Sequence, residues 1–547
     1  MSCGSVSLQR RENIGEKRVE HLFELLKQYA EGDIYPYHMP GHKRQAWGML
    51  PRQLYEMDIT EIEGFDNLHQ PEGILYEMQQ RAARIYGADE SFYLINGSTC
   101  GILCAISSAL PPGGHILMAR NCHKSAYHGA YLRNLAVSYL WPAYLKEYDI
   151  YDTVTPEQIR GALEREPDIG AVLIVSPTYE GRIADVEAIA GAVHEKGIPL
   201  IVDEAHGAHL GLAEGFSRNS CQAGADLVIH SVHKTLPSLT QTALLHVNGE
   251  RIDRRLLKRF LHIYQSSSPS YLLMASIDNA LQYVEAWGQE AFKKFRRLYG
   301  EMMERLSGCR HLRFLRDVQT AYGGWTECMQ GRQDIGKLLI SVKLTNLTGR
   351  QLYEILLDKY HLQTEMAAES YVLAMFTVND GEEAYRRMTE ALLEIDESLT
   401  VLPTEDKPEK KAVNLEGRGD AVPLAAAWDM PAEEIPLEES IGRYAGEFIS
   451  LYPPGIPLLV PGERMTKELC GRIQEAWEQG LTVQGIRIQE KDGCCAEKDN
   501  LYTKVLCGKE EICKNAAGRD IIYVKVLNIS YRLHQKENVD VFSKDHR

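Results

Sequence analysis

One lysine follows shortly after an apolar segment, and this position needs a chemical explanation. The segment "DLVIHS" (226–231) is typical of a buried strand, and Lys234 stands three residues beyond it. Burying an ammonium group costs free energy unless the group is paired, neutralised or used. Partial burial lowers the pKa of a lysine, and the neutral amine can then form a Schiff base with an aldehyde. Ser231 and His233 flank this lysine and can donate hydrogen bonds to a phosphate.

Two other strand ends carry groups that suit the same chemistry. Gly97, Ser98 and Thr99 stand between an apolar strand and a helix, where free N–H groups and hydroxyls can cradle a phosphate. The same three residues are also an ordinary helix start. Asp203 ends the strand "PLIVD" and can either cap a helix or keep a pyridine nitrogen protonated, which makes the ring an electron sink. His206, three residues later, belongs either to the wall of a site or to a polar loop.

The elements that carry these residues predict one sheet. Between about residues 75 and 245, short apolar strands alternate with helical patterns; the strands are "SFYLI", "HILMA", "AVLIVS", "PLIVDE" and "DLVIHS". This alternation is typical of a mostly parallel sheet covered by helices. The carboxyl ends of parallel strands meet at one edge, so the phosphate cradle, Asp203 and Lys234 are expected to lie together.

Composition limits the classes of function. The chain has 547 residues, a formal net charge of −16 and 44% hydrophobic residues, which indicates a globular protein of several domains. The acidic balance argues against a nucleic-acid partner. The start of the sequence lacks the apolar core of a signal peptide, and no apolar run reaches membrane-spanning length, so a cytoplasmic protein without membrane contact is expected. No metal site is predicted, because Cys494, Cys495, Cys507 and Cys513 lack the paired spacing of a zinc site.

The combination of motifs resembles a known family. Gly97-Ser98-Thr99, "RNCHKS" (120–125), "SPTYEG" (176–181), "DEAHG" (203–207) and "SVHKTL" (231–236) occur in the order seen in pyridoxal-phosphate enzymes of fold type I. "PGHK" (40–43) and "YPPGIP" with "PGE" (452–463) are similar to signatures of the bacterial ornithine/lysine/arginine decarboxylases, in their short form without a receiver-like N-terminal domain. The resemblance spans about residues 17–489.

The resemblance implies roles for individual residues. Lys234 would hold pyridoxal 5'-phosphate covalently, Asp203 would pair with its pyridinium nitrogen, and His123 would stack on the ring. His233 joins these three as a catalytic candidate, because it or Lys234 could deliver the proton that replaces carbon dioxide. The cofactor-binding set is Gly97, Ser98, Thr99, His123, Asp203, Ala205, His206, Ser231, His233, Lys234 and Ser267. Ser267 or Ser268 would reach the phosphate of a neighbouring subunit, where serine replaces the family's usual threonine. His206 stands where tryptophan is frequent.

The predicted domain organisation follows the same resemblance. We expect an N-terminal helix and arm (1–60), a pyridoxal-phosphate-binding large domain like that of aspartate aminotransferase (61–330), and a small α/β domain (331–403). A linker (404–424), an α+β C-terminal decarboxylase domain (425–489) and a peripheral tail (490–547) complete the prediction. Ile441, Tyr444, Ala445, Phe448 and Ile449 have helical spacing, which predicts one helix over this stretch.

The function implied is decarboxylation of a basic amino acid. The substrate would be arginine, lysine or ornithine, the product the corresponding amine, and the active unit a homodimer or higher homo-oligomer. Glu365 and acids near "YPPGIP" are candidates to receive the cationic side chain, and each can equally be an ordinary acid on the surface. Two alternatives stay open: an aminotransferase on the same fold, and a catalytically silent homologue that binds a partner protein.

Overall fold

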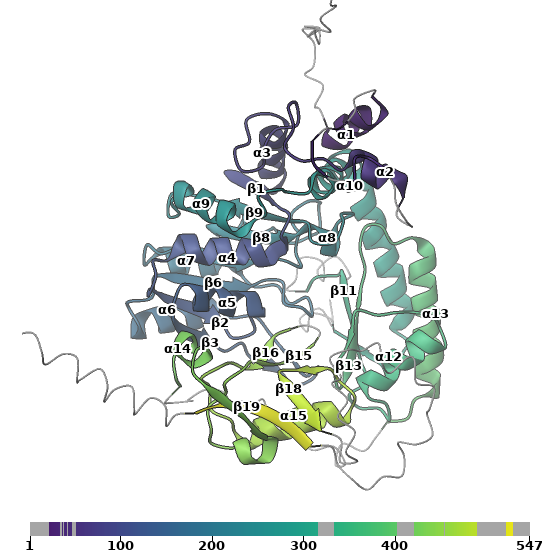
Figure 1. Ribbon diagram of the computed structural model, residues 1–547. Coiled ribbons are helices and arrows are strands. Elements are labelled where there is room, and N and C mark those ends of the chain that lie inside the picture. The colour runs from purple at the N-terminus through teal and green to yellow at the C-terminus, as the bar shows by residue number, and fades with distance from the viewer. Residues whose placement is uncertain are drawn as a thin grey trace, which may run out of the picture.

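A seven-stranded, mostly parallel sheet forms the centre of the larger part of the molecule (Figure 1). The computed structural model describes residues 21–32, 36, 38–40, 42–45, 51–315, 333–401, 421–452, 455–489 and 521–528. In spatial order the strands are β1 (Glu90–Leu94), β9 (Ala243–Val247), β8 (Leu227–Ser231), β7 (Leu200–Asp203), β6 (Ala171–Val175), β2 (His115–Ala119) and β3 (Ala136–Leu140). Only β9 runs against the others in this sheet. The expected fold class is confirmed.

Helices cover both faces of this sheet, because its central strands are apolar on both sides. They are α3 (Ile74–Tyr86), α4 (Gly97–Ala109), α5 (Lys124–Leu132), α6 (Pro156–Arg165), α7 (Val186–His194), the short α8 (Val232–Thr235) and α9 (Arg254–Tyr264). Helix α4 lies close to the sheet at Gly101, where an added Cβ would stand 2.8 Å from Leu94 and 3.0 Å from Ile229. A glycine at this position therefore lets the start of α4 lie directly over the carboxyl edge of the sheet.

A smaller antiparallel sheet stands beside the large one. Its strands, in spatial order, are β10 (Arg313–Phe314), β11 (Lys337–Ser341), β13 (Tyr371–Met375) and β12 (Met366–Ala367). Helices α12 (Gly349–Asp358) and α13 (Glu382–Ser398) pack on it, and the long helix α10 (Tyr271–Leu306) connects the two parts and runs beside α13 (Figure 1). The cavity described below lies between these two sheets.

The C-terminal part contains two three-stranded sheets and one longer helix, α15 (Lys467–Glu478). One sheet has the order β14 (Ala432–Pro436), β19 (Ile521–Leu527), β18 (Ile486–Gln489), and the other β16 (Pro457–Leu459), β15 (Ile449–Leu451), β17 (Val483–Gln484). The peripheral tail predicted over 490–547 is therefore wrong for one stretch, since β19 is the middle strand of its sheet. Its apolar side chains belong to the core of this part of the molecule, whereas 490–520 and 529–547 lie outside the described residues.

The helix predicted over Ile441–Ile449 is also wrong. The structure has turns there, a 3-10 turn before them (Leu437–Ser440) and the strand β15 after them. Gly442 has φ +84°, a conformation that ends helical geometry, and an added Cβ at Gly446 would stand 2.7 Å from Ala432. Close packing against β14 therefore overrides the helical spacing of the apolar residues.

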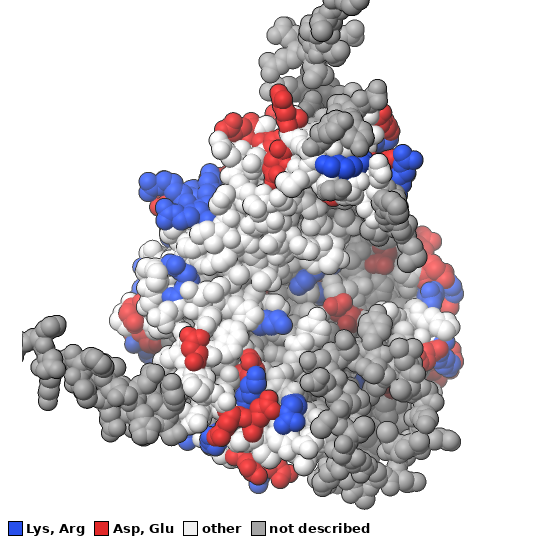
Figure 2. All heavy atoms as spheres, viewed as in Figure 1, with Lys and Arg blue, Asp and Glu red and all other residues white. Residues whose placement is uncertain are grey.

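The remaining described elements are short. They are α1 (Leu22–Glu31), α2 (Arg52–Met57), α14 (Leu424–Trp428) and the hairpin of β4 (Tyr144–Leu145) and β5 (Ile150–Tyr151). Within the described ranges, no helix combines the length and the apolar character needed to cross a bilayer. Figure 2 shows acidic and basic side chains interspersed over the viewed face, with a broad uncharged area over α4.

Candidate active site

A cavity of about 450 Å³ opens at the carboxyl edge of the large sheet. Three parts of the chain form its walls. The first is the set of loops that follow β1, β2, β6, β7 and β8 of the large sheet. The part built on the small sheet contributes Glu365 and Met375, and the C-terminal part contributes Tyr452 and Ile456. The strand ends meet here because the sheet is parallel, as the sequence predicts. The cavity thus collects side chains that are far apart in the sequence.

Lys234 and Asp203 both line this cavity, at the ends of neighbouring strands. Burial lowers the pKa of Lys234, although Asp203 and Glu365 oppose that shift. Burial likewise raises the pKa of Asp203, while Lys234 and the N–H of Ala205, 3.2 Å from the carboxylate, lower it. The lysine is therefore closer to its nucleophilic amine form than a lysine in water.

His206 lies between two lysines and also lines the cavity. Its Nε2 is 3.0 Å from Nζ of Lys234, and its Nδ1 is 2.7 Å from Nζ of Lys337, the first residue of β11. Burial lowers the pKa of the imidazole, and both lysines lower it further, so the ring is neutral. Of the two roles left open for His206, the structure places it in the wall.

His123 caps the start of α5 and faces the same cavity. Its Nδ1 accepts a hydrogen bond from the N–H of Ser125 at 3.2 Å, so the neutral ring carries its proton on Nε2. Burial, with Lys234 nearby, lowers the pKa of this histidine to about 4. From the C-terminal part, Gly455 approaches so closely that an added Cβ would stand 3.5 Å from Nε2.

The proposed phosphate end of the cavity is built at the start of α4. Gly97, with φ +75°, opens the helix, and Ser98 lines the cavity. The buried hydroxyl of Ser231 has no hydrogen-bond partner among the described residues, and His233 lines the cavity while its Nδ1 lies 2.9 Å from the carbonyl oxygen of Thr242. An unpaired buried hydroxyl beside a helix N-terminus fits a phosphate group.

Four predicted site residues do not line these walls. Gly97 and the fully buried Ser231 lie behind the lining residues, Thr99 is exposed, and Ser267 is exposed in the loop before α10. Ala205 does line the cavity. A Schiff-base lysine, a carboxylate for a ring nitrogen, a histidine for a ring face and an open phosphate end together fit the groups of pyridoxal 5'-phosphate.

Tyr179, Tyr452 and Lys337 are among the residues at or behind the walls that the sequence did not single out. The Tyr179 hydroxyl donates a short hydrogen bond to Glu365, and its ring meets that of His206 edge-on at 4.8 Å. Tyr179 lies within "SPTYEG", so the motif itself was the available signal. For Lys337 the signal was weaker: a lysine at the start of the apolar strand "KLLIS".

A buried ion pair fixes the C-terminal part against the large sheet. The guanidinium of Arg120, at the end of β2, bonds both carboxylate oxygens of Glu463 at 3.1 and 2.9 Å. The same side chain donates to the carbonyl oxygen of Pro457 at 2.7 Å, beside the loop that carries Tyr452 and Gly455. Arg120 is 4% exposed and Glu463 5%, so this pair holds one wall of the cavity in place.

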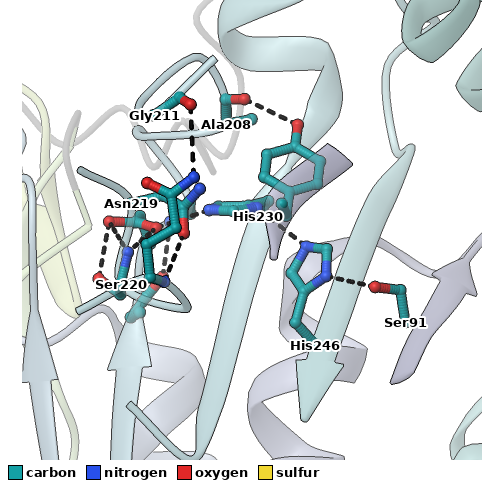
Figure 3. A network of polar contacts seen from close by, with 12 residues as sticks. Ser91, Ala208, Gly211, Asn219, Ser220, His230 and His246 are labelled. Atoms are coloured by element: carbon teal, nitrogen blue, oxygen red, sulfur yellow. Dashed lines mark hydrogen bonds and ion pairs between the residues drawn. The ribbon is translucent and has the colours of Figure 1, made fainter. Parts of the chain in front are cut away.

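A second chain of buried polar groups joins His230 and His246 to Ser91 (Figure 3). Glu204 points away from the cavity and pairs with Nε2 of His230 at 2.7 Å. Nδ1 of that histidine is 3.0 Å from Nε2 of His246, whose Nδ1 is 2.6 Å from the hydroxyl of Ser91. The hydroxyl of Ser220 donates to the other oxygen of Glu204 at 2.7 Å, and the backbone N–H of Ser220 is shared between the two carboxylate oxygens. This network fixes the backbone on which Asp203 stands.

In the part of the chain that the structure describes, no group of His, Cys, Asp or Glu side chains is arranged to hold a metal ion. Cys494, Cys495, Cys507 and Cys513 lie outside the described residues.

Comparison with known proteins identifies two family models in the chain. The Orn/Lys/Arg decarboxylase major domain matches residues 20–319, and the Orn/Lys/Arg decarboxylase C-terminal domain matches residues 424–476. The first match alone spans more than half of the chain.

Individual relatives cover most of the chain. YaaO of Bacillus subtilis (strain 168), an uncharacterized protein, is 34% identical over 489 residues, which cover 86% of this chain and 97% of YaaO. An arginine decarboxylase of the same organism is 32% identical over 480 residues, covering 85% and 95%. The crystal structure of the Francisella novicida lysine decarboxylase LdcF is similar in fold, with a TM-score of 0.74, 17% identity and coverage of 93% of this chain and 81% of LdcF.

Proposed function

Because the chain belongs to the Orn/Lys/Arg decarboxylase family, carboxy-lyases of basic amino acids that use pyridoxal 5'-phosphate, we propose that it converts arginine into agmatine and carbon dioxide. The choice of arginine is supported by four relatives named arginine decarboxylase, which are 29–32% identical and are covered over 94–96% of their length. The relatives named lysine decarboxylase are 23% identical.

The observation that carries this proposal is that one cavity joins Lys234 and Asp203 with the carboxylate of Glu365. When bound, the cofactor supplies an electron sink for the bond that breaks between the α-carbon and the carboxylate. Lys234 would hold the cofactor and release it to the substrate amine. Asp203 would keep the ring nitrogen protonated, and His123 would cover one face of the ring.

A proton must replace the carboxylate that leaves the α-carbon. Lys234 is the first candidate donor, because its amine would be set free when the substrate binds. His233 lines the same cavity and is the second candidate. Tyr452 and Ile456, held by the Arg120–Glu463 pair, would exclude water from this step.

Glu365 would receive the cationic end of the substrate. Its carboxylate is oriented by the Tyr179 hydroxyl, which occupies one oxygen and leaves the other available. A planar guanidinium offers several N–H donors to a carboxylate, whereas an ammonium offers a point charge. A fixed carboxylate is therefore a better partner for the guanidinium of arginine than for the ammonium of ornithine. The side chain of ornithine is also shorter and reaches less far.

The test is to incubate the enzyme, loaded with cofactor, separately with arginine, lysine and ornithine and to identify the product. We expect agmatine and carbon dioxide from arginine. Cadaverine from lysine as the main product would overturn the choice of arginine. A keto acid with the cofactor left in its amine form would instead indicate an aminotransferase, and a protein without visible cofactor absorbance would indicate a silent homologue.

We also propose a homodimer as the active unit. Ser267 is exposed and lies off the walls of its own cavity, which fits a role at the phosphate of a second copy. The uncharged area over α4 suits an interface between copies (Figure 2). Light scattering after gel filtration should give twice the mass of 61.8 kDa. The free thiols of Cys100, Cys104 and Cys122 fit a reducing compartment, and we propose the cytoplasm.

A further inference from the structure

Tyr179 and Glu365 meet at the wall of the cavity, although they belong to different sheets. Tyr179 follows β6 of the large sheet, and Glu365 precedes β12 of the small one. The Tyr179 hydroxyl donates a short hydrogen bond to Oε1 of Glu365. Burial, and then the charge of Glu365, raise the pKa of this hydroxyl, so it keeps its proton and remains the donor. A side chain from the edge of the large sheet therefore holds a carboxylate of the small sheet.

The turn that carries Tyr179 is itself tied to the segment that leads into the small sheet. The N–H of Asp334 donates to the carbonyl oxygen of Gly181 at 2.7 Å, and the side-chain amide of Gln333 donates to that of Glu180 at 2.9 Å. Gly181 has φ +93°, and an added Cβ there would stand 2.6 Å from Nε2 of Gln333. These contacts hold the turn in place, so Tyr179 approaches the carboxylate from a fixed side.

The carboxylate of Glu365 is held at its backbone as well and still has room for a ligand. Its backbone N–H donates to the carbonyl oxygen of Leu373 in β13 at 2.9 Å. A carboxylate has about four lone-pair positions, so the bond from Tyr179 leaves the second oxygen open and a further position on the first. Of the described residues that line the cavity, two are acids, Asp203 and Glu365. Asp203 has its proposed place at the ring nitrogen, which leaves Glu365 for the cationic end of the substrate.

The two kinds of cationic side chain make different demands on this carboxylate. A guanidinium is planar, and it bonds both oxygens at once only when its plane is aligned with that of the carboxylate. An ammonium group is a compact charge with rotatable donors, so it bonds a carboxylate in many orientations. Restricting the orientation of the carboxylate therefore favours the binding of a guanidinium much more than the binding of an ammonium group.

We infer that Tyr179 is a positioning residue that makes the cavity select a guanidinium over an ammonium group, because its hydroxyl fixes the carboxylate of Glu365. The inference rests on the proposed role of Glu365 and adds the residue that gives this role its selectivity. The attraction for a cation comes from the charge of Glu365, and the discrimination between cations comes from the Tyr179 hydroxyl. Loss of the charge should weaken every cationic ligand, whereas loss of the hydroxyl should weaken only the planar one.

Two amines of similar length separate the effect of charge from the effect of orientation. Agmatine ends in a guanidinium and cadaverine in an ammonium group, and both carry an amine at the other end. Titration calorimetry on the cofactor-loaded enzyme gives the dissociation constant of each. In Tyr179→Phe, which keeps the ring beside His206, the dissociation constant of agmatine should rise about five- to tenfold. That of cadaverine should stay within about twofold of wild type. Equal changes for the two amines, or no change for agmatine, would overturn the inference.

Tyr131→Phe is the matched control. The Tyr131 hydroxyl donates to Asp429 at 2.6 Å, so it is also a tyrosine–acid contact between two parts of the chain, but it does not line the cavity. Both dissociation constants should stay at their wild-type values, and a selective loss of agmatine binding here would contradict the role given to Tyr179. Glu365→Gln should raise both dissociation constants. If it weakened agmatine alone, the division between charge and orientation would be wrong.

A measurement on the wild type decides if Tyr179→Phe does not fold. Agmatine with a methyl group on each terminal guanidinium nitrogen keeps its charge but loses the paired N–H donors. It should bind at least about fivefold more weakly than agmatine, and equal binding would refute the inference. The choice of arginine is judged separately, from the product that the wild type forms. If lysine is the main substrate while Tyr179→Phe still loses agmatine selectively, the choice of arginine fails and the inference stands.

Discussion

Two buried chains of histidine hydrogen bonds start from consecutive parts of one loop, and they differ in where they end. The chain Lys234–His206–Lys337 reaches the cavity, whereas the chain Glu204–His230–His246–Ser91 is closed at both ends (Figure 3). Histidines in both chains are almost fully buried. The difference teaches that burial and residue type do not separate a reactive histidine from a structural one; contact with the cavity does.

The closed chain satisfies every polar group that its own members present. Tyr86 packs on both of its imidazoles, with ring centres 4.6 Å from His230 and 4.7 Å from His246. Burial raises the pKa of Glu204 to about 8 and lowers that of His230 to about 3, which favours neutral forms of both. Substitutions in this closed chain should therefore change the stability of the protein. Substitutions in the chain Lys234–His206–Lys337, which reaches the cavity, should change the reaction.

The largest expected effect is that of Lys234→Ala. Without its amine the protein cannot hold the cofactor covalently, so the visible absorbance should disappear and amine formation should fall by at least about a thousandfold. Absorbance spectra and product assays measure both. Lys258→Ala, which removes a half-exposed lysine paired with Glu90, is the control. Normal turnover in Lys234→Ala would contradict the assignment.

Asp203→Asn should have the next largest effect. The amide cannot keep a ring nitrogen protonated, so kcat should fall by about a hundredfold to a thousandfold, a range typical of lost electrostatic stabilisation. Steady-state kinetics with arginine and thermal unfolding test this. The matched control is its neighbour: Glu204→Gln should keep kcat within about threefold of wild type. Equal losses in the two variants would break the distinction between Asp203, which faces the cavity, and Glu204, which belongs to the closed chain.

Glu204→Gln should instead alter how the free energy of unfolding depends on pH. The pKa of Glu204 is raised on folding from its ordinary value to about 8, so the stabilisation it provides at low pH is lost as the pH rises towards 8. Glutamine stays neutral throughout. The free energy of unfolding of the variant, relative to wild type, should therefore increase by about 2–4 kcal/mol from about pH 5 to about pH 8. Urea unfolding at both pH values measures this, and a constant difference would mean that the folded protein holds Glu204 ionised.

Glu365→Gln should have the smallest effect of the series. The amide keeps a hydrogen bond but loses the charge, so KM for arginine should rise about tenfold with kcat within about threefold. Steady-state kinetics separate the two constants. Glu369→Gln is the control, because Glu369 pairs with Gln479 outside the cavity. A lower kcat with unchanged KM would place Glu365 in the chemical step.

The sequence predicts the large sheet and its edge well, for a physical reason. Strands that are buried on both faces appear in the sequence as continuous runs of apolar residues. A polar residue at the end of such a run is easy to recognise, as Asp203 and Lys234 are. The fold class and the approach of these two residues follow from local patterns alone.

The residues that the sequence did not single out depend on contacts between distant segments. Lys337 begins a strand of the small sheet, 103 positions after Lys234, and nothing in its own neighbourhood indicates that His206 stands against it. The strand β19 was missed for the same reason, since it pairs with β14 and β18 across long gaps in the sequence. The helical spacing over Ile441–Ile449 predicted a helix that does not form, because Gly446 lies directly against Ala432.

The Arg120–Glu463 pair has a consequence for the order in which the protein is made. The two residues are 343 positions apart, so when the large sheet has left the ribosome, its buried guanidinium still lacks the carboxylate that neutralises it. The loop with Tyr452 and Gly455 is also synthesised after every other wall of the cavity. A nascent chain therefore contains Lys234 and Asp203 before it contains the residues that close the cavity over them.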